Sequence, residues 1–149
     1  MPSVAIEWFS DDKYAYSTAL MFAYINLCKP TKTKLKLDEL KFNLEHNSWA
    51  NNVRPIDVIE DMKNKKYKDE VQRIKKANTK YPIIIDSNYN ILDGVHRYVK
   101  HIIEDKKTIN AYIFDKKLMK KFIIGKREEA KNLEINDFIE LFKKRFDKC

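Results

Sequence analysis

The sequence predicts an α+β protein in which a small mixed sheet is flanked by helices. Three segments carry this prediction. Residues 81–86 form a short apolar run of strand length, which is typical of a buried strand. Residues 108–114 alternate apolar and polar side chains, as strands do. Between them, from Gly94 onward, apolar residues recur at helical spacing.

Composition and charge indicate a globular protein that attracts anions. The chain has 149 residues, of which 44% are hydrophobic and 35% charged, a balance that fits one folded domain rather than a disordered chain. The formal net charge of +8 favours phosphate-bearing partners, which include nucleotides, nucleic acid and anionic lipid. An AT-rich genome is the alternative explanation, since it enriches lysine, isoleucine, asparagine and tyrosine without any role in DNA binding.

The two cysteines predict no disulfide framework. Cys28 and Cys149 belong to no Cys-x-x-Cys motif and lie near no pair of histidines, so we expect a reduced, intracellular protein in the cytoplasm, nucleoid or nucleus. No secretory signal opens the sequence, and the apolar stretch 19–28 is too short to cross a bilayer. We therefore expect no membrane partner.

The first part of the chain predicts a strand and two helices. Residues 4–9 favour a strand, after which Ser10 is suited to cap a helix that runs to Cys28. Residues 32–36 form a basic loop or a short extended segment. A second helix is predicted over 38–49, with its apolar residues on one side.

The middle of the chain predicts two short helices and a hairpin. Pro55 fits the first turn of a helix, and residues 68–77 have the spacing of another. Residues 87–90 are rich in turn-forming side chains, so 81–86 and 90–92 are expected to pair as a hairpin.

The helix that follows Gly94 is amphipathic, and two more helices follow it. Asp115 is suited to cap a helix that Gly125 ends, and Asn136 is suited to cap the last helix. In the helix after Gly94, the inward stripe is Val95, Tyr98, Val99, Ile102 and Ile103, and the outward stripe is His96, Arg97, Lys100, His101 and Glu104.

Asp93 to Arg97 form the candidate anion-binding segment. The first N–H groups of a helix have no partner within it and carry the positive end of the helix dipole. Gly94, one of two glycines in the chain, lets the backbone approach a ligand closely. His96 and Arg97 are unfavourable at a helix start unless an anion lies between them and the backbone. The alternative is that Arg97 pairs on the surface with Asp93 or Glu104.

The segment from Tyr81 to Tyr112 resembles the ParB/sulfiredoxin family. That family has a strand, a turn, a strand, an Asp-Gly-x-His-Arg motif or a relative of it, a helix and a strand. The matching runs here are Ile83-Ile-Ile-Asp, Ile91-Leu-Asp-Gly-Val-His-Arg-Tyr and Thr108-Ile-Asn-Ala-Tyr. The resemblance implies a ParB/sulfiredoxin-like core over 50–125, an N-terminal extension over 1–49 and a C-terminal helix over 126–149, in one compact domain.

The motif helps to choose among the branches of that family. Sulfiredoxins carry a catalytic cysteine where this chain has Val95, so sulfinic-acid reduction is not expected. The CTP-binding partition proteins carry Gly-Glu-Arg-Arg at this place and read DNA with a helix-turn-helix, which this sequence does not indicate. The motif is most similar to the Asp-Gly-His-His-Arg of the free-serine kinases, from which it departs only at Val95.

The resemblance implies a nucleotide-binding protein that transfers a phosphoryl group or hydrolyses a nucleotide. The phosphates of ATP, ADP or CTP, with or without Mg²⁺, would be bound by Gly94, Val95, His96 and Arg97. The acceptor would be a small molecule with a hydroxyl group. The serine-kinase base implies Asp57 as the catalytic base here. Glu60 and Asp61 are the rivals, and a first-turn helix acid is the alternative explanation of Asp57.

A metal site made only of protein ligands is not predicted, because no histidine, cysteine and carboxylate cluster has ligand spacing. The acidic residues Glu60, Asp61, Asp69 and Glu70 lie among lysines and predict a solvated surface. Two other functions stay open. One is a DNA-associated, nucleotide-binding switch or partition-like module that uses the lysine-rich surface, and the other is an interaction protein that has lost catalysis.

Overall fold

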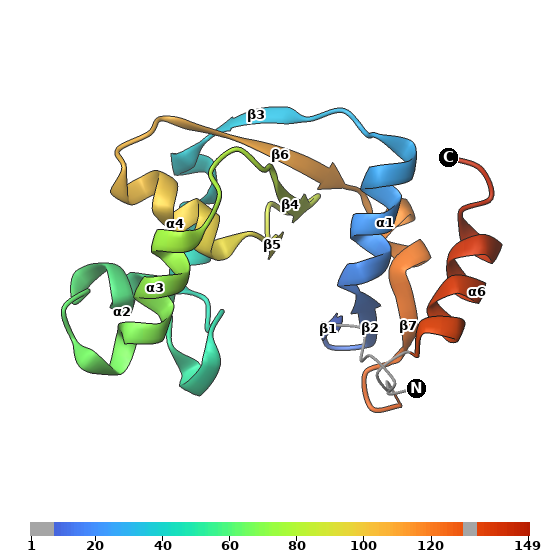
Figure 1. Ribbon diagram of the computed structural model, residues 1–149, viewed down its shortest axis with the longest axis horizontal. Helices are drawn as coiled ribbons and strands as arrows, with labels where there is room; N and C mark the ends of the chain where they lie inside the picture. Colours follow the sequence, from blue (N-terminus) through green and yellow to red (C-terminus); the bar gives the residue numbers. More distant parts are fainter. Residues whose placement is uncertain (1–7, 130–133) are drawn as a thin grey trace. The chain divides into compact units, whose positions relative to one another are not determined.

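The computed structural model describes residues 8–129 and 134–149 and has an α+β fold with small sheets flanked by helices (Figure 1). The chain forms two compact units, which we name by their order in the sequence. The inner unit is Thr31–Phe114, and the outer unit combines Met1–Pro30 with Asp115–Cys149. The predicted boundaries after residues 49 and 125 do not coincide with these units, because 31–49 contribute a strand to the sheet of the inner unit.

The inner unit is organised by a four-stranded sheet with the order β3-β6-β4-β5. β4 and β6 run parallel, and the other pairs run antiparallel. Parallel neighbours need a crossover, and α4 supplies it. The strands are β3 (Thr33–Lys36), β4 (Ile83–Asp86), β5 (Ile91–Asp93) and β6 (Thr108–Phe114), and the α-helices are α2 (Pro55–Glu60), α3 (Lys68–Lys76) and α4 (Val95–Ile103).

Several sequence-based predictions for the inner unit are confirmed. The hairpin of β4 and β5 forms, and the carboxylate of Asp86 fixes its turn by accepting hydrogen bonds from the backbone N–H groups of Asn88 and Asn90. Pro55 begins α2, and 32–36 take the extended alternative as β3. The helix predicted over 38–49 is instead a shorter 3₁₀ helix, η1 (Leu37–Glu45). Two further 3₁₀ turns are η2 (Ala50–Asn52) and η3 (Lys65–Tyr67).

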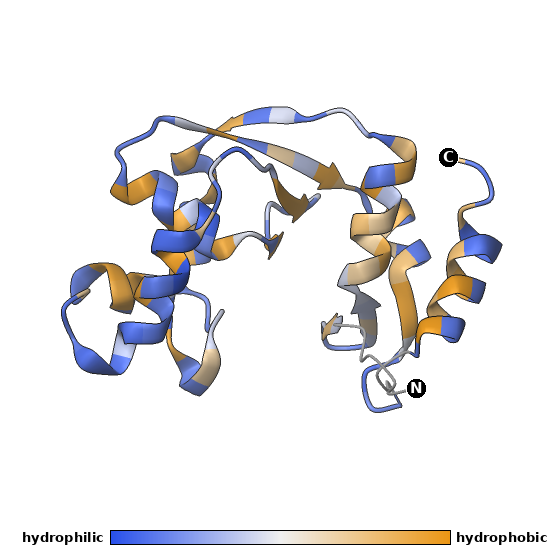
Figure 2. Cartoon of the chain, in the orientation of Figure 1, coloured by the Kyte–Doolittle hydropathy of each residue, from blue (hydrophilic) through white to orange (hydrophobic). Residues whose placement is uncertain are grey.

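The core of the inner unit is built from residues of its sheet and its helices, whose hydrophobic stretches are orange in Figure 2. The Tyr98 hydroxyl is buried and donates a hydrogen bond to the carbonyl of Leu37, so its polar atom is satisfied. The predicted inward stripe of α4 is confirmed at Tyr98 and Val99, whereas Ile103 is exposed. The buried cluster consists of Leu35, Leu37, Leu40, Leu44, Val58, Val71, Ile74, Ile83, Ile85, Tyr98, Val99, Ile109 and Ala111.

The outer unit has a three-stranded antiparallel sheet with the order β1-β2-β7. Its buried side chains include Leu20, Phe122 and Phe146, and the rings of the last two stack on each other. Its elements are β1 (Trp8–Ser10), β2 (Tyr14–Ser17), α1 (Thr18–Cys28), α5 (Lys116–Met119), the 3₁₀ turn η4 (Lys120–Phe122), β7 (Ile123–Lys126) and α6 (Ile135–Arg145).

The start of α1 differs from the prediction. Residues 14–17 form β2 rather than the first turns of a helix, and Ser17, not Ser10, caps α1 by accepting a hydrogen bond from the N–H of Leu20. The reason lies in Asp11, whose carboxylate accepts from the N–H groups of Lys13 and Tyr14 and so closes a turn between two strands. Of the predicted strand 4–9, residues 4–7 lie outside the described residues.

Two predicted helix ends in the C-terminal part are also wrong. Gly125 lies inside β7, opposite Ala15, rather than at the end of a helix. Glu134 precedes α6, so Asn136 lies within the first turn and does not cap it. The predicted cap at Asp115 is confirmed, since its carboxylate accepts from the N–H of Leu118.

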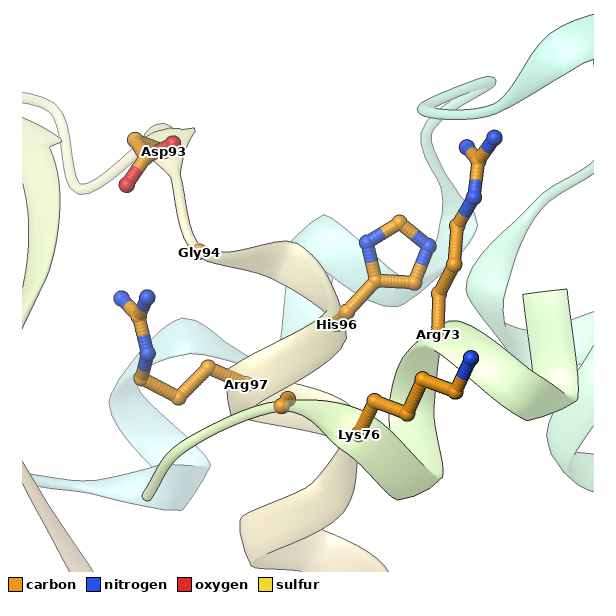
Figure 3. A pocket seen from close by; sticks show the side chains of 7 residues that line it. Arg73, Lys76, Asp93, Gly94, His96 and Arg97 are labelled. Atoms are coloured by element: carbon orange, nitrogen blue, oxygen red, sulfur yellow. The ribbon is translucent and has the colours of Figure 1, made fainter. Parts of the chain in front are cut away.

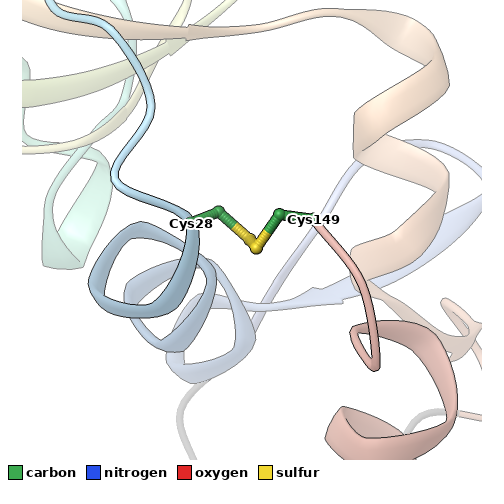
Figure 4. The surroundings of a disulfide bond; sticks show 2 residues. All are labelled: Cys28 and Cys149. Carbon is green, nitrogen blue, oxygen red and sulfur yellow. A yellow bond between two sulfur atoms is a disulfide. The ribbon is translucent and has the colours of Figure 1, made fainter.

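Cys28 and Cys149 form a disulfide bond within the outer unit, so the prediction that they are unpaired is wrong (Figure 4). The two residues are 121 positions apart, and their spacing in the sequence gave no motif that could reveal the pairing. The bond joins the end of α1 to the segment that follows α6. Among residues 8–129 and 134–149, no helix is both long and apolar enough to cross a membrane.

Candidate functional site

Gly94 sets the geometry of the candidate site because its backbone takes a left-handed conformation, with φ 104° and ψ 23°, directly before α4. A Cβ atom at this position would lie 2.6 Å from Cγ2 of Ile83, so no other residue fits without displacement. The carbonyl of Gly94 accepts a hydrogen bond from the N–H of Tyr98, and Gly94, at the N-cap position, has no side chain with which to cap α4. The N–H groups of the first turn therefore present the positive end of the helix dipole to the space in front of the helix start.

A cavity of about 310 Å³ lies at this helix start (Figure 3). Three of its side chains are basic: Arg73 and Lys76 come from α3, and Arg97 comes from α4. Asp93 is the one carboxylate in the lining. The complete lining is Arg73, Lys76, Ala77, Asp93, Gly94, His96 and Arg97.

The structure brings together three of the four predicted phosphate-binding residues. Gly94, His96 and Arg97 line the cavity. Val95 does not, because its side chain packs against the core of the inner unit. Val95 begins α4, so its backbone N–H has no carbonyl partner within the helix.

Arg97 also holds the chain around it in place. Its Nε donates to the carbonyl of Asn78 at 3.0 Å, and Nη1 donates to the carbonyl of Pro82 at 2.9 Å. The guanidinium lies over the ring of Tyr81, 5.9 Å from the ring centre. The surface pair with Glu104 is not formed, since Glu104 pairs with Lys106. Arg97 is thus a structural clamp as well as a cation in the cavity.

His96 forms an arrangement that the sequence did not indicate. Its Nε2 lies 2.5 Å from Oε2 of Glu70, and its ring stacks on Trp49 with ring centres 4.6 Å apart and planes 15° apart. Glu70 is only 14% exposed, so the prediction that it belongs to a solvated surface is wrong. The spacing held one clue, because Glu70 is four residues before the buried Ile74 and shares its helix face.

Asp57, the predicted base, is held by Arg54. The Arg54 side chain donates to Oδ1 from Nη2 at 2.8 Å and to Oδ2 from Nε at 3.1 Å, and its backbone N–H also donates to Oδ2. These bonds lower the pKa of Asp57, with the side-chain bond as the largest cause. Asp57 does not line the Gly94 cavity, and its position fits the alternative of a first-turn helix acid. Its catalytic role stays a prediction.

His101 was expected on the outward stripe of α4, but it is 5% exposed. Its Nδ1 lies 2.8 Å from the carbonyl of Arg97, one helical turn earlier. Burial lowers the pKa of His101 from its ordinary value, because the charged imidazolium loses contact with water. His101 therefore belongs to the packing of α4 and not to the cavity.

The described residues contain no group of three or more histidine, cysteine and carboxylate side chains placed to hold a metal ion. Searches among protein-family models, curated proteins and solved structures found no match to this chain. The assignment to the ParB/sulfiredoxin family therefore stays a prediction that depends on the pattern of residues 81–112.

Proposed function

We propose that the Gly94 cavity binds the phosphate groups of a nucleotide and that the protein transfers a phosphoryl group from it to a small hydroxyl compound or to water. One observation carries the proposal: the start of α4 and the side chains of Arg73, Lys76 and Arg97 line one cavity of about 310 Å³. Exposed N–H groups and fixed cations together are the usual means by which proteins bind phosphate.

The arrangement of the inner unit supports the finer fold assignment within this proposal. The order β4, turn, β5, Asp93-Gly94-Val95-His96-Arg97, α4, β6 is the order of the ParB/sulfiredoxin pattern. The parallel pairing of β4 with β6 places the motif at the end of β5 and the start of the crossover helix. We propose on this ground that the inner unit is ParB/sulfiredoxin-like and that its motif serves phosphate binding, as in the serine-kinase branch.

Transfer of a phosphoryl group needs a proton acceptor for the attacking hydroxyl, and His96 has the better placement. When Nε2–H of His96 donates to Glu70, Nδ1 is left with a lone pair that can accept a proton. In Figure 3 one ring nitrogen of His96 faces Gly94 and Asp93, and the other faces Arg73 on α3, the helix that carries Glu70. A histidine base held by a carboxylate is the arrangement that many hydroxyl-activating enzymes use.

In the proposed phosphoryl transfer, two bonds form and two bonds break. The acceptor hydroxyl gives its proton to Nδ1 of His96, its oxygen forms a bond to the terminal phosphorus, and the bond from that phosphorus to the bridging oxygen breaks. Arg73 and Lys76 neutralise charge on the phosphate oxygens. A Mg²⁺ ion brought by the nucleotide would supply further charge neutralisation, and the carboxylate of Asp93 is the lining group suited to it.

Nucleotide binding is tested by calorimetric titration of ATP, ADP and CTP. Lys76→Ala is the informative variant, because Lys76 lines the cavity and is exposed. We expect it to weaken binding by about tenfold, the value of one charge-assisted contact. Lys107→Ala is the matched control, since Lys107 is 85% exposed and follows the other end of α4. Arg97→Ala is unsuitable because it also releases the carbonyls of Asn78 and Pro82.

The base is tested by phosphate release and by transfer to serine, with binding measured in parallel. Glu70→Gln keeps the shape of the His96 pair but removes its charge, so we expect turnover to fall by about 10² or more while nucleotide affinity stays within threefold. Asp57→Asn tests the rival base in the same assay. Loss of turnover in Asp57→Asn with an active Glu70→Gln would assign the base to Asp57, and absence of nucleotide binding to the wild type would remove the proposed function altogether.

A further inference from the structure

A second cavity, of about 320 Å³, lies beside α3 and the segment that precedes it. Every charged side chain in its lining is a lysine, and two amide side chains, Asn64 and Gln72, complete its polar part. None of these four lysines forms an ion pair with a carboxylate among the described residues. The complete lining is Met62, Lys63, Asn64, Lys65, Lys68, Val71, Gln72 and Lys75.

The two cavities share α3. Val71 and Ile74 turn into the core, and Glu70 turns toward His96, so the remaining faces of α3 are open to solvent. Lys68, Gln72 and Lys75 line the second cavity on one of these faces, whereas Arg73 and Lys76 line the Gly94 cavity on the next face round the helix. The outer surface of α3 is therefore one hydrophilic, mainly cationic strip, as the blue of this helix in Figure 2 indicates. The two cavities adjoin this strip.

We infer that this strip, formed by residues 63–76, binds the phosphate backbone of a nucleic acid. Lysine is a point charge without the fork that reads a base edge, so binding should depend on charge and not on sequence. The amide nitrogen of Asn64 donates to the carboxylate of Asp61. The lysine amines of the strip are therefore the main groups that would contact the phosphates. The inference does not depend on phosphoryl transfer at Gly94.

A nucleic acid fits this strip better than an anionic membrane does. Binding at a membrane interface needs exposed apolar side chains beside the cations. The large hydrophobic residues that are exposed in the described chain include none between 60 and 77. Phosphate-backbone binding needs no such apolar face, because the release of counterions supplies its free energy.

The test is fluorescence anisotropy with a labelled 20-base-pair duplex of mixed sequence at several salt concentrations. The variant replaces Lys63, Lys65 and Lys68 by alanine, all exposed and outside the Gly94 cavity. The matched control replaces Lys116, Lys117 and Lys120, which are exposed lysines of the outer unit and lower the net charge by the same amount. Circular dichroism of both variants checks that each is folded.

We expect the strip variant to bind roughly tenfold or more weaker at 0.1 M salt, and its log–log salt slope to fall by about 2–3, since each lost phosphate contact removes about 0.9. The control should stay within twofold. Equal losses in the two variants would show that charge acts diffusely and would overturn the inference, as would absence of binding by the wild type at 50 mM salt. Vesicles containing phosphatidylserine that bind through the same lysines, with no binding of DNA, would assign the strip to a membrane instead.

Discussion

At the scale of a single residue, Gly94 serves both the packing of the fold and the candidate site. Its left-handed backbone ends β5 and starts α4, and the place of its missing side chain is taken by Ile83 and by Nη1 of Arg97. Gly94 also lines the cavity, so the residue whose lack of a side chain permits this packing is part of the candidate site. Stability and binding are therefore linked at this position.

Gly94→Ala should destabilise the inner unit by about 2–4 kcal/mol, which combines the cost of a left-handed alanine with that of overpacking against Ile83. Urea unfolding measured by circular dichroism gives the value. A loss below about 1 kcal/mol would mean that the neighbours yield easily and would contradict the steric account.

His101 gives the inner unit a pH dependence with a definite sign. Burial depresses the folded-state pKa of His101 below 6.5, so the unfolded chain takes up a proton that the folded chain resists. The stabilisation is complete above the unfolded pKa and is lost as pH falls through it toward the folded value. We expect the free energy of unfolding to fall between pH 7.5 and 5.5. His101→Gln should flatten this dependence in the same urea titrations, and an unchanged slope would exclude His101 as its source.

The start of α1 shows how local contacts decide an element. The sequence predicts Ser10 as the cap, and Tyr16, Leu20 and Ala23 have helical spacing from an early point. This predicted start is too early. The turn closed by Asp11 turns residues 14–17 into a strand, because β7 is available to pair with them.

Ser17→Ala should destabilise the outer unit by about 1 kcal/mol, since it removes the hydrogen bond from the N–H of Leu20. Ser10→Ala is the matched control, because Ser10 is exposed in β1 and caps nothing. Thermal unfolding of the two variants checks the difference. A larger effect for Ser10→Ala would support the helix start that the sequence first suggested.

Elements in the inner unit were easier to predict than side-chain partners. β4, β6 and α4 follow from apolar period and length, and each is present. The Glu70–His96 pair was missed because α3 and α4 meet through tertiary packing, and no local pattern shows which residue of one helix faces the other. Asp57 lies in the first turn of α2, as one of its two interpretations predicted, but the sequence did not indicate that Arg54, three residues earlier, would bind its carboxylate.

The disulfide acts at the scale of the whole molecule because it cross-links two residues that are 121 positions apart in the sequence. Cys28 and Cys149 enclose most of the sequence, and a cross-link of this span stabilises by at most about 4–5 kcal/mol in the chain-entropy account. We expect reduction by dithiothreitol, or the Cys28→Ser variant, to increase hydrogen exchange in α1 and α6. Amides of β4 and β6 in the inner unit should keep their protection, and equal loss in both units would contradict this assignment.

The inner unit lies between the two segments of the outer unit in the sequence, and this sets the order in which the two units are synthesised. The first and last strands of the inner unit, β3 and β6, pair antiparallel with Thr33 opposite Ala111. The two ends of the inner unit therefore lie next to each other in its sheet. A ribosome delivers all of the inner unit before it delivers β7 and α6. The Gly94 cavity can therefore form on the nascent chain while β2 still lacks its partner β7, and the outer unit is completed last, when its second half emerges.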